Sequence, residues 1–299
     1  MAWRGLHLTK PTRLSLADGQ VVAAQEDGDV RVPLEDLAWI VLDAPQSTLT
    51  GSLLSACTSA GVALIATDER HTPSGVLLPF HSHFRQGEIA HRQAEMSAPL
   101  KKRLWQKVVR AKIENQAAAL LAKDREGVQA LREMIHLVGS GDPDNVEARA
   151  ARHYWAHLWP EFRREDGGDR RNKLLNYGYA VMRSGIARSL VAAGLLPAFG
   201  LNHASVTNAF NLADDIVEPF RPFVDDLAWK LTEGRPSRSD LSIDDRRAMA
   251  SVLLAEADVT GDAVTLLVAS ERAAESLVRA IEGSSAELLE LPAFADQQG

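Results

Sequence analysis

The chain has 299 residues, a formal net charge of −7 and a single cysteine. One cysteine excludes a disulfide framework and any metal site built from several cysteines. The sequence has no charged-then-apolar leader and no apolar run approaching about 18 residues, so we expect a cytoplasmic protein without a membrane span.

The first third predicts a small β-rich domain. Short segments, many of them alternating, are separated by turn pairs such as Asp18-Gly19, which is a typical hairpin signal. The expected strands are 3–8, 12–16, 20–24, 30–33, 39–42 and 62–66, with one helix at 50–60. The isolated glycines form no phosphate-binding loop. We therefore assign residues 1–95, linker included, a structural or dimer-forming role.

From about residue 98 the apolar spacing becomes that of helices. Helices are predicted at 100–123, at 125–138, from about 146, at 174–197, at 226–231, at 243–255 and at 261–282. The fold class is therefore α+β, in which the β-rich domain is followed by a larger all-α catalytic domain at 96–299.

Basic residues concentrate in the middle of the chain. From Lys101 to Arg188 there are 18 Lys and Arg against 11 Asp and Glu, so this part carries +7 and the rest −14. Such a face suits DNA phosphate, although solvated helix surfaces give the same composition. The candidate DNA contacts are Lys101, Lys102, Arg103, Lys107, Arg110, Arg163, Arg164, Arg170, Arg171 and Lys173.

Glu147 stands out on the helix that is predicted from about residue 146, with Asp144 or Asn145 as its N-cap. It shares a helix face with Ala150, Tyr154 and Leu158. A carboxylate on an apolar face is costly unless it is paired or metal-bound, so Glu147 is a candidate ligand. The alternative is a glutamate whose stem packs while its carboxylate reaches water near the helix start.

A second possible metal site lies on the same helix. His153 and His157 are four residues apart and Glu161 follows one turn later. No HExxH signature is present, and Pro160 is expected to end the helix before Glu161. We therefore rank this group below Glu147.

The stretch 199–224 contains the other candidate ligands. His203 precedes three acids, Asp214, Asp215 and Glu218, which would share one side of a continuous helix. Like charges at that spacing need a cation among them, either a metal ion or a basic group.

Five segments together resemble one family. They are HTPSGVLLPFHSH, LWQKVVRAKIENQA, GDPDNVEARAAR, LNYGYAVMRSGIARSLVAAGLLPAFG and FNLADDIVEPFRPFVD, and they run from about residue 71 to 225. In them the chain is similar to CRISPR-associated protein one, the spacer-integrating enzyme, in its type II branch. The resemblance implies a metal held by Glu147, His203 and Glu218, with Asp215 and Arg221 beside it. Asn202 departs from the pair of adjacent histidines that type II relatives often have.

The resemblance also implies an activity. Two carboxylates and an imidazole suit Mg²⁺ or Mn²⁺. The expected reaction is insertion of short DNA spacers into a CRISPR array, by attack of a 3′-hydroxyl on a phosphodiester. Expected partners are double-stranded DNA (the prespacer and the leader-repeat), a second copy of this chain, CRISPR-associated protein two in a heterohexamer, and the type II effector nuclease. The alternatives are a stand-alone metal-dependent nuclease on branched DNA and a non-catalytic DNA-binding scaffold.

Overall fold

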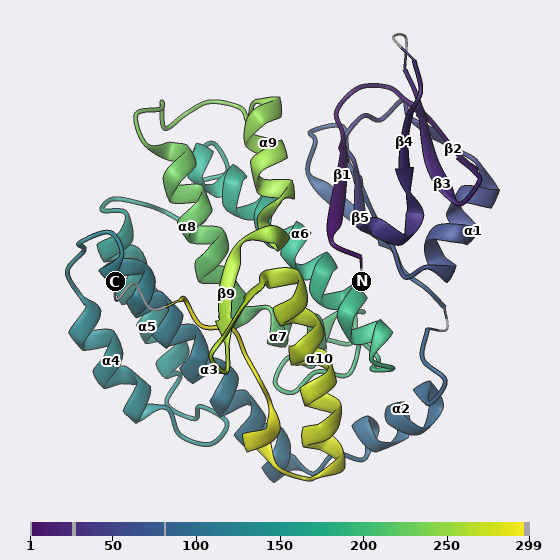
Figure 1. The fold of residues 1–299 in the computed structure, drawn as a ribbon. Coiled ribbons are helices and arrows are strands. Elements are labelled where there is room, and N and C mark those ends of the chain that lie inside the picture. The colour runs from purple at the N-terminus through teal and green to yellow at the C-terminus, as the bar shows by residue number, and fades with distance from the viewer. Residues whose placement is uncertain (1, 26–27, 81, 296–299) are drawn as a thin grey trace.

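The structure is a computed structural model, and it describes residues 2–25, 28–80 and 82–295 (Figure 1). Strands β1 to β5 gather at one corner of the molecule together with α1, and most of the helices, with β9 among them, form the rest. Within these ranges no helix is both long enough and apolar enough to cross a membrane. The predicted α+β class is confirmed.

The N-terminal part contains two four-stranded sheets. One has the order β1-β5-β7-β8 and the other β4-β3-β2-β6. The strands are β1 (Arg4–Leu8), β2 (Arg13–Ala17), β3 (Gln20–Ala24), β4 (Val30–Pro33), β5 (Leu37–Leu42), β6 (Thr48–Leu49), β7 (Ala63–Thr67) and β8 (Pro73–Leu77). The predicted hairpin at Asp18-Gly19 joins β2 to β3 in antiparallel register. Helix α1 (Gly51–Ser59) covers this part and completes a core around Leu14, Ile40 and Leu53.

The helical part is built around two long helices, α3 and α6. Its helices are α2 (Gln86–Ala94), α3 (Ala98–Leu121), α4 (Val128–Leu137), α5 (Val146–Leu158), α6 (Arg170–Ala192), α7 (Asn211–Ile216), α8 (Arg221–Thr232), α9 (Ile243–Ala250) and α10 (Leu266–Glu282). Helix α6 is buried almost all round because it carries Gly, Ala and Ser where neighbours approach. Added Cβ atoms at Gly178 and Gly185 would meet side chains at 2.3 and 2.6 Å.

The larger of two hydrophobic cores contains residues of both parts. Alternate residues of β5 face opposite ways, so that Ile40 packs in the N-terminal core while Trp39 and Val41 pack against the helices. The Trp39 Nε1 donates to the carbonyl of Ala250 at 3.1 Å. The boundary between residues 95 and 96 therefore stays a prediction.

Fully buried Asp43, just after β5, also joins the two parts. Its carboxylate meets His7 Nε2 at 3.1 Å, His71 Nδ1 at 2.9 Å and Arg246 Nε at 2.7 Å. Arg246 comes from α9, so this acid ties the sheet to the helical part. Here one carboxylate has three nitrogen partners.

The helical part is not all-α, which corrects the sequence prediction. A hairpin of β9 (Glu256–Val259) and β10 (Asp262–Thr265) occupies the start of the predicted helix 261–282. Its turn uses Thr260 and Gly261, which both have positive φ angles. Helix α10 therefore begins at Leu266, where Thr265 caps it.

Candidate functional site

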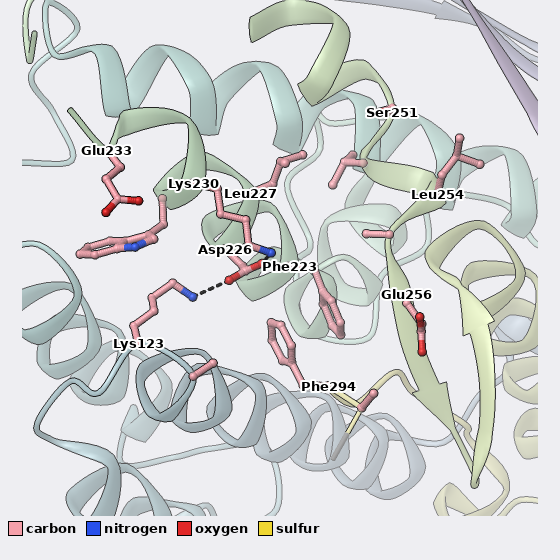
Figure 2. Close-up of a pocket in the computed structure, with 15 residues that line it drawn as sticks. Lys123, Phe223, Asp226, Leu227, Lys230, Glu233, Ser251, Leu254, Glu256 and Phe294 are labelled. Carbon is pink, nitrogen blue, oxygen red and sulfur yellow. Dashed lines mark hydrogen bonds and ion pairs between the residues drawn. The ribbon is translucent and has the colours of Figure 1, made fainter. Parts of the chain in front are cut away.

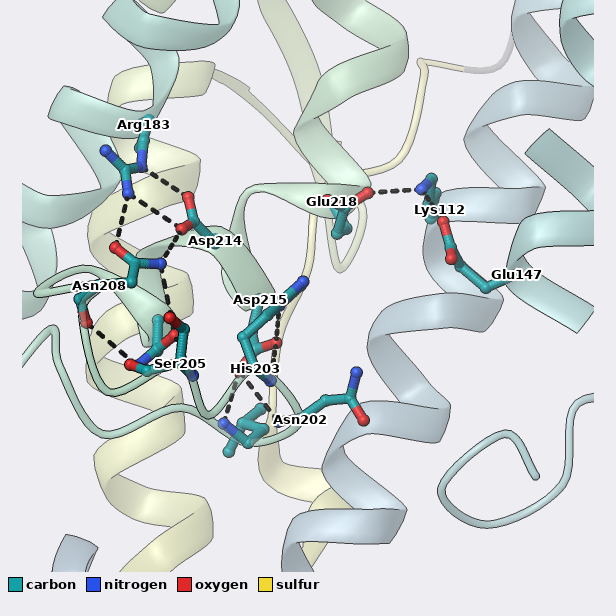
Figure 3. Close-up of polar contacts among 12 residues, drawn as sticks. Lys112, Glu147, Arg183, Asn202, His203, Ser205, Asn208, Asp214, Asp215 and Glu218 are labelled. Atoms are coloured by element: carbon teal, nitrogen blue, oxygen red, sulfur yellow. Dashed lines mark hydrogen bonds and ion pairs between the residues drawn. The ribbon is translucent and has the colours of Figure 1, made fainter. Parts of the chain in front are cut away.

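Lys112 lies at the centre of the candidate site, on α3 (Figure 3). It is 7% exposed, and its ammonium pairs with the carboxylates of both Glu147 and Glu218. The Nζ to Glu218 Oε2 distance is 2.5 Å. A buried lysine needs such partners, because burial alone strongly disfavours its charge.

Glu147 reaches Lys112 from the first turn of α5. Asn145, one of the two residues predicted as the N-cap, occupies that position, but its side chain makes no capping hydrogen bond. Asp142 caps the helix instead, because its carboxylate accepts from the backbone N–H groups of Val146 at 2.9 Å and Glu147 at 3.0 Å. The buried Ala150, Tyr154 and Leu158 confirm the apolar face that made Glu147 conspicuous.

Glu218 begins a short 3₁₀ turn, Glu218–Phe220, between α7 and α8. Asn115 of α3 fixes this turn by donating from Nδ2 to the carbonyl of Pro219 at 2.8 Å. Arg221 donates from Nε to Glu218 Oε1 at 2.8 Å and stacks over the ring of Tyr179. Glu218 is therefore held between two cations.

The charges around Glu218 decide its ionisation. Burial opposes the carboxylate form, but Lys112 and Arg221 outweigh that effect and lower the pKa of Glu218 to about 2. Burial likewise opposes the charged form of Lys112, and the two glutamates nevertheless raise the pKa of Lys112. Glu218 and Lys112 are therefore charged at neutral pH.

Asp215 organises the loop that carries His203. This fully buried carboxylate accepts from the backbone N–H groups of Leu201 at 2.5 Å, Asn202 at 3.0 Å and His203 at 3.1 Å. It also meets His203 Nδ1 at 2.6 Å, and this bond raises the pKa of His203. The loop approaches so closely that a Cβ on Gly200 would lie 2.7 Å from Asp215 Oδ2. With Nδ1 engaged, Nε2 is the ring atom left for a ligand.

The three acids of 199–224 do not form one cluster, contrary to the expectation for a continuous helix. Helix α7 ends at Ile216, and Pro219 and Pro222 redirect the backbone. Asp214 therefore pairs with Arg183, Asp215 with His203, and Glu218 with Lys112 (Figure 3). Glu218 also pairs with Arg221. Basic side chains supply the cations that the sequence demanded.

Of the three expected ligands, the structure joins two. Glu147 and Glu218 meet at Lys112, whereas His203 is bonded to Asp215. Accordingly, within residues 2–25, 28–80 and 82–295 no group of three or more His, Cys, Asp or Glu is arranged to hold a metal ion. His203 is still close enough for the charge of Glu218 to contribute to its raised pKa.

The histidine pair on α5 makes other contacts. His153 Nε2 meets the carbonyl of Gly127 at 3.0 Å, and His157 Nδ1 meets the carbonyl of His153 at 2.8 Å. The helix ends at Leu158, before Pro160, as predicted. Glu161 therefore does not continue the helix face of the two histidines.

The candidate DNA contacts differ in exposure. Lys102, Arg103, Arg110 and Arg163 are exposed, and Lys101, Lys107, Arg164, Arg171 and Lys173 are partly so. Arg170 is 3% exposed and pairs with Asp245 at 2.6 Å. That burial is at odds with a DNA contact, so Arg170 is a structural residue.

A small pocket of about 150 Å³ opens beside the paired charges. Lys112, Arg164, Tyr179, Glu218 and Arg221 are among its lining residues. A larger pocket of about 940 Å³ lies at the end of α3, around the ion pair of Lys123 and Asp226 (Figure 2). It contains none of the predicted site residues.

Sequence reasoning missed Lys112 and Asp142. Lys112 belongs to a helix with many Lys and Arg, and periodicity could have found it, because it lies four residues after Val108 on the apolar face. Asp142 lies three residues before the N-cap position, and the standard capping patterns do not include a residue at that position.

A family model described as CRISPR associated protein Cas1 matches residues 6–257. The chain belongs to the Cas1 family. It is 36% identical over 296 residues to a CRISPR-associated endonuclease Cas1 of Neisseria meningitidis, covering 98% of this chain and 96% of the relative. It is 26% identical to a Cas1 endonuclease of Pyrobaculum aerophilum, over 90% of this chain and 96% of the relative.

Solved structures share the fold of this Cas1 chain. A casposase bound to integration product has a TM-score of 0.77 at 17% identity, covering 94% of this chain and 91% of that one. A CAS1 protein from Thermotoga maritima has a TM-score of 0.73 at 16% identity, over 99% and 100%. A Cas6-RT-Cas1–Cas2 complex matches with a TM-score of 0.72 at 18% identity, over 99% of this chain and 36% of that chain.

Proposed function

We propose that the protein is a metal-dependent DNA integrase and endonuclease of CRISPR adaptation. The observation that carries the proposal is the convergence of Glu147 and Glu218 on a single cation beside a basic pocket. Membership of the Cas1 family and the casposase fold support it. An isolated scaffold protein would have no use for two glutamates forced together in this way.

The donor set fits a divalent ion. Glu218 Oε2 is buried and has an ion pair with Lys112, but it has no hydrogen bond among the described residues. Glu147, His203 Nε2 and Glu218 would hold Mg²⁺ or Mn²⁺, for which oxygen ligands with one imidazole are suitable. When bound, such an ion polarises a phosphate and stabilises charge on the attacking or leaving oxygen.

The side chains of this chain have distinct tasks in the reaction. Asp215 holds the His203 loop in place through its four hydrogen bonds. Arg221 lines the pocket and places positive charge where a phosphate would enter, as does Arg164. The incoming 3′-hydroxyl forms a new phosphate ester bond, and the old ester bond breaks and releases a 3′-hydroxyl. One ester bond replaces another in a single step, so the reaction needs no covalent enzyme intermediate.

The proposal extends to partners. Integration joins two DNA ends, so two active sites are needed, and two homodimers bridged by a dimer of Cas2, a heterohexamer, would supply them. The solved relative in a Cas6-RT-Cas1–Cas2 complex is consistent with this assembly. Exposed Lys102, Arg103 and Arg163 would contact the DNA backbone without reading sequence. The type II effector nuclease would assist spacer choice in the cytoplasm.

The test is a joining assay. The protein, with Cas2, is incubated with a supercoiled CRISPR plasmid, labelled prespacer DNA and Mn²⁺. We expect labelled DNA to become joined to the plasmid, and we expect the His203→Ala variant to lose this product. Cutting without joining would favour a stand-alone nuclease instead. Unchanged joining and cutting in His203→Ala would favour a scaffold.

DNA binding provides an independent check. Phosphate contacts release counterions, so affinity should fall steeply between 50 and 200 mM salt, by about 10³-fold for some six contacts. Fluorescence anisotropy with a short duplex measures this. An affinity that does not change with salt would contradict the assigned basic contacts.

A further inference from the structure

The charges around Lys112 balance without a metal ion. Glu147 and Glu218 carry −2, and Lys112 and Arg221 carry +2. A divalent cation bound between the glutamates would leave this group with a surplus of +2. In a nearly buried site such a surplus needs an anion or the departure of a cation. Lys112 is the cation whose position is tied to both glutamates.

Lys112 has a second polar group within reach on its own helix. Gln116 lies one turn further along α3 and is 3% exposed. Its Oε1 is buried and has no hydrogen-bond partner in the part of the chain that the structure describes. Gln116 and Lys112 line the same pocket as Arg164 and Arg221. Side chains four residues apart on a helix face each other, so Oε1 can accept from a displaced ammonium.

We propose that Lys112 is an exchangeable counterion that couples metal binding to DNA binding, an inference that rests on the proposed function. Without metal, its ammonium neutralises Glu147 and Glu218. With a divalent cation between the glutamates, the ammonium moves toward Gln116 Oε1 and the pocket. There it joins Arg164 and Arg221 in attracting a DNA phosphate. Lys112 therefore weakens metal binding in the absence of DNA and strengthens DNA binding in the presence of metal.

The first experiment measures Mn²⁺ affinity without DNA. Electron paramagnetic resonance measures the free Mn²⁺ concentration during titration of the wild type and of Lys112→Met. This substitution removes the ammonium charge and leaves an unbranched side chain of similar length. We expect Lys112→Met to bind Mn²⁺ about tenfold more tightly, because the competing charge is gone. Equal or weaker binding would overturn the proposal. Lys123→Met is the matched control, because the side chains of Lys123 and Lys112 are 7% and 9% exposed. Lys123 pairs with Asp226 in the larger pocket, which contains no site residue (Figure 2).

The second experiment measures DNA affinity with and without Mn²⁺. Binding linkage is reciprocal, so an ammonium released by the metal must appear as a gain in DNA affinity. We expect Mn²⁺ to tighten duplex binding of the wild type, and we expect this gain to shrink about tenfold in Lys112→Met. Lys123→Met should keep the whole gain. A gain of equal size in Lys112→Met would contradict the coupling.

A third measurement uses the wild type alone, in case Lys112→Met does not fold. An amine-reactive reagent followed by mass spectrometry reports the reactivity of each lysine. Lys112 should become more reactive on adding Mn²⁺ and protected again on adding DNA, while Lys123 stays unchanged. Lys112 reactivity that ignores both additions would refute the exchange. None of the three readouts uses catalysis, so a failure of joining would count against the proposed function alone.

Discussion

This molecule contains two buried clusters of charged side chains that differ in their ratio of hydrogen-bond donors to acceptors. Around Asp43, one carboxylate is met by three nitrogen groups, from His7, His71 and Arg246. Around Lys112, one ammonium is shared by two carboxylates, Glu147 and Glu218. The first group is rich in donors and the second is rich in acceptors.

The difference separates a structural joint from a binding site. Asp43 is fully buried and ties β5 to α9, so a change there should be felt in the packing of the sheet on the helices. The Lys112 group borders a pocket, and one of its buried oxygens has an ion pair but no hydrogen bond. The oxygen without a hydrogen bond and the pocket beside it leave room for a cation to enter. These two features, more than burial, distinguish the two groups.

The largest effect should come from Glu218→Gln. It removes the more buried of the two glutamate charges, so we expect joining of prespacer to plasmid to fall by about 10³-fold or more, equivalent to about 4 kcal/mol of barrier. The joining assay above measures it, and Glu233→Gln, at the exposed C-cap of α8, is the control. Joining within tenfold of wild type would mean that the Lys112 group, like the Asp43 group, is structural and not a binding site.

Asp43→Asn tests the other group. Its loss of charge leaves Arg246 buried beside a neutral partner, which should lower the free energy of unfolding by about 3 kcal/mol. Urea unfolding followed by circular dichroism measures the change. The half-exposed pair of Arg4 and Asp36 is the control, and Asp36→Asn should cost less than about 1 kcal/mol. Equal costs for the two variants would show that Asp43 is not a joint.

Asp215→Asn should have an intermediate effect. The amide would turn a donor toward backbone N–H groups that now meet acceptors, and His203 would lose its fixed orientation. Loss of a group that orients a ligand costs about 10–100-fold in metal affinity or activity. A Mn²⁺ titration checks it. If Asn leaves metal affinity unchanged, His203 does not belong with Glu147 and Glu218.

The smallest effect per pH unit concerns Asp225, a buried acid that makes no ion pair within the described residues. Burial raises its pKa to about 7, while Tyr179 donates a hydrogen bond to it. The folded state then holds a proton that the unfolded state releases above pH 4. Stability should therefore fall as pH rises from about 4 to 7, by up to about 1.4 kcal/mol per pH unit from this group.

Asp225→Asn is the test of that slope. Melting curves between pH 4.5 and 7.5 should be flatter for the variant than for the wild type. Parallel curves would mean that Asp225 is ionised throughout, and that a buried acid here needs no cation.

Local patterns predicted a good share of the fold. Alternation and turn residues placed β1 to β5 and α1 within about two residues, because strand and hairpin signals are local. They failed at β9 and β10, where short strands flank a two-residue turn and α10 follows at once. The type and order of the long helices were right, since each has a long apolar face.

Only part of the candidate site could be predicted from the sequence. Glu147 could be found because one acid interrupted an apolar face. The partners of the three later acids could not, because Pro219 and Pro222 break the helix that the spacing assumed. Lys112 and Asp43 depend on contacts between segments 35 to 203 residues apart, and one sequence carries no record of such contacts.

The amide of Asn115 has a practical consequence for anyone who handles the protein. Besides the turn at Pro219, it holds the carbonyl of Pro292 at 2.9 Å, and it accepts from the N–H of Phe294. Phe294 stacks in turn on Phe223 of α8. Residues 292–294 are thus held, through Asn115, to the same turn that presents Glu218. Affinity tags belong after residue 295, and deletion from Pro292 onward would loosen the turn without removing Lys112, Glu147, Glu218 or Arg221.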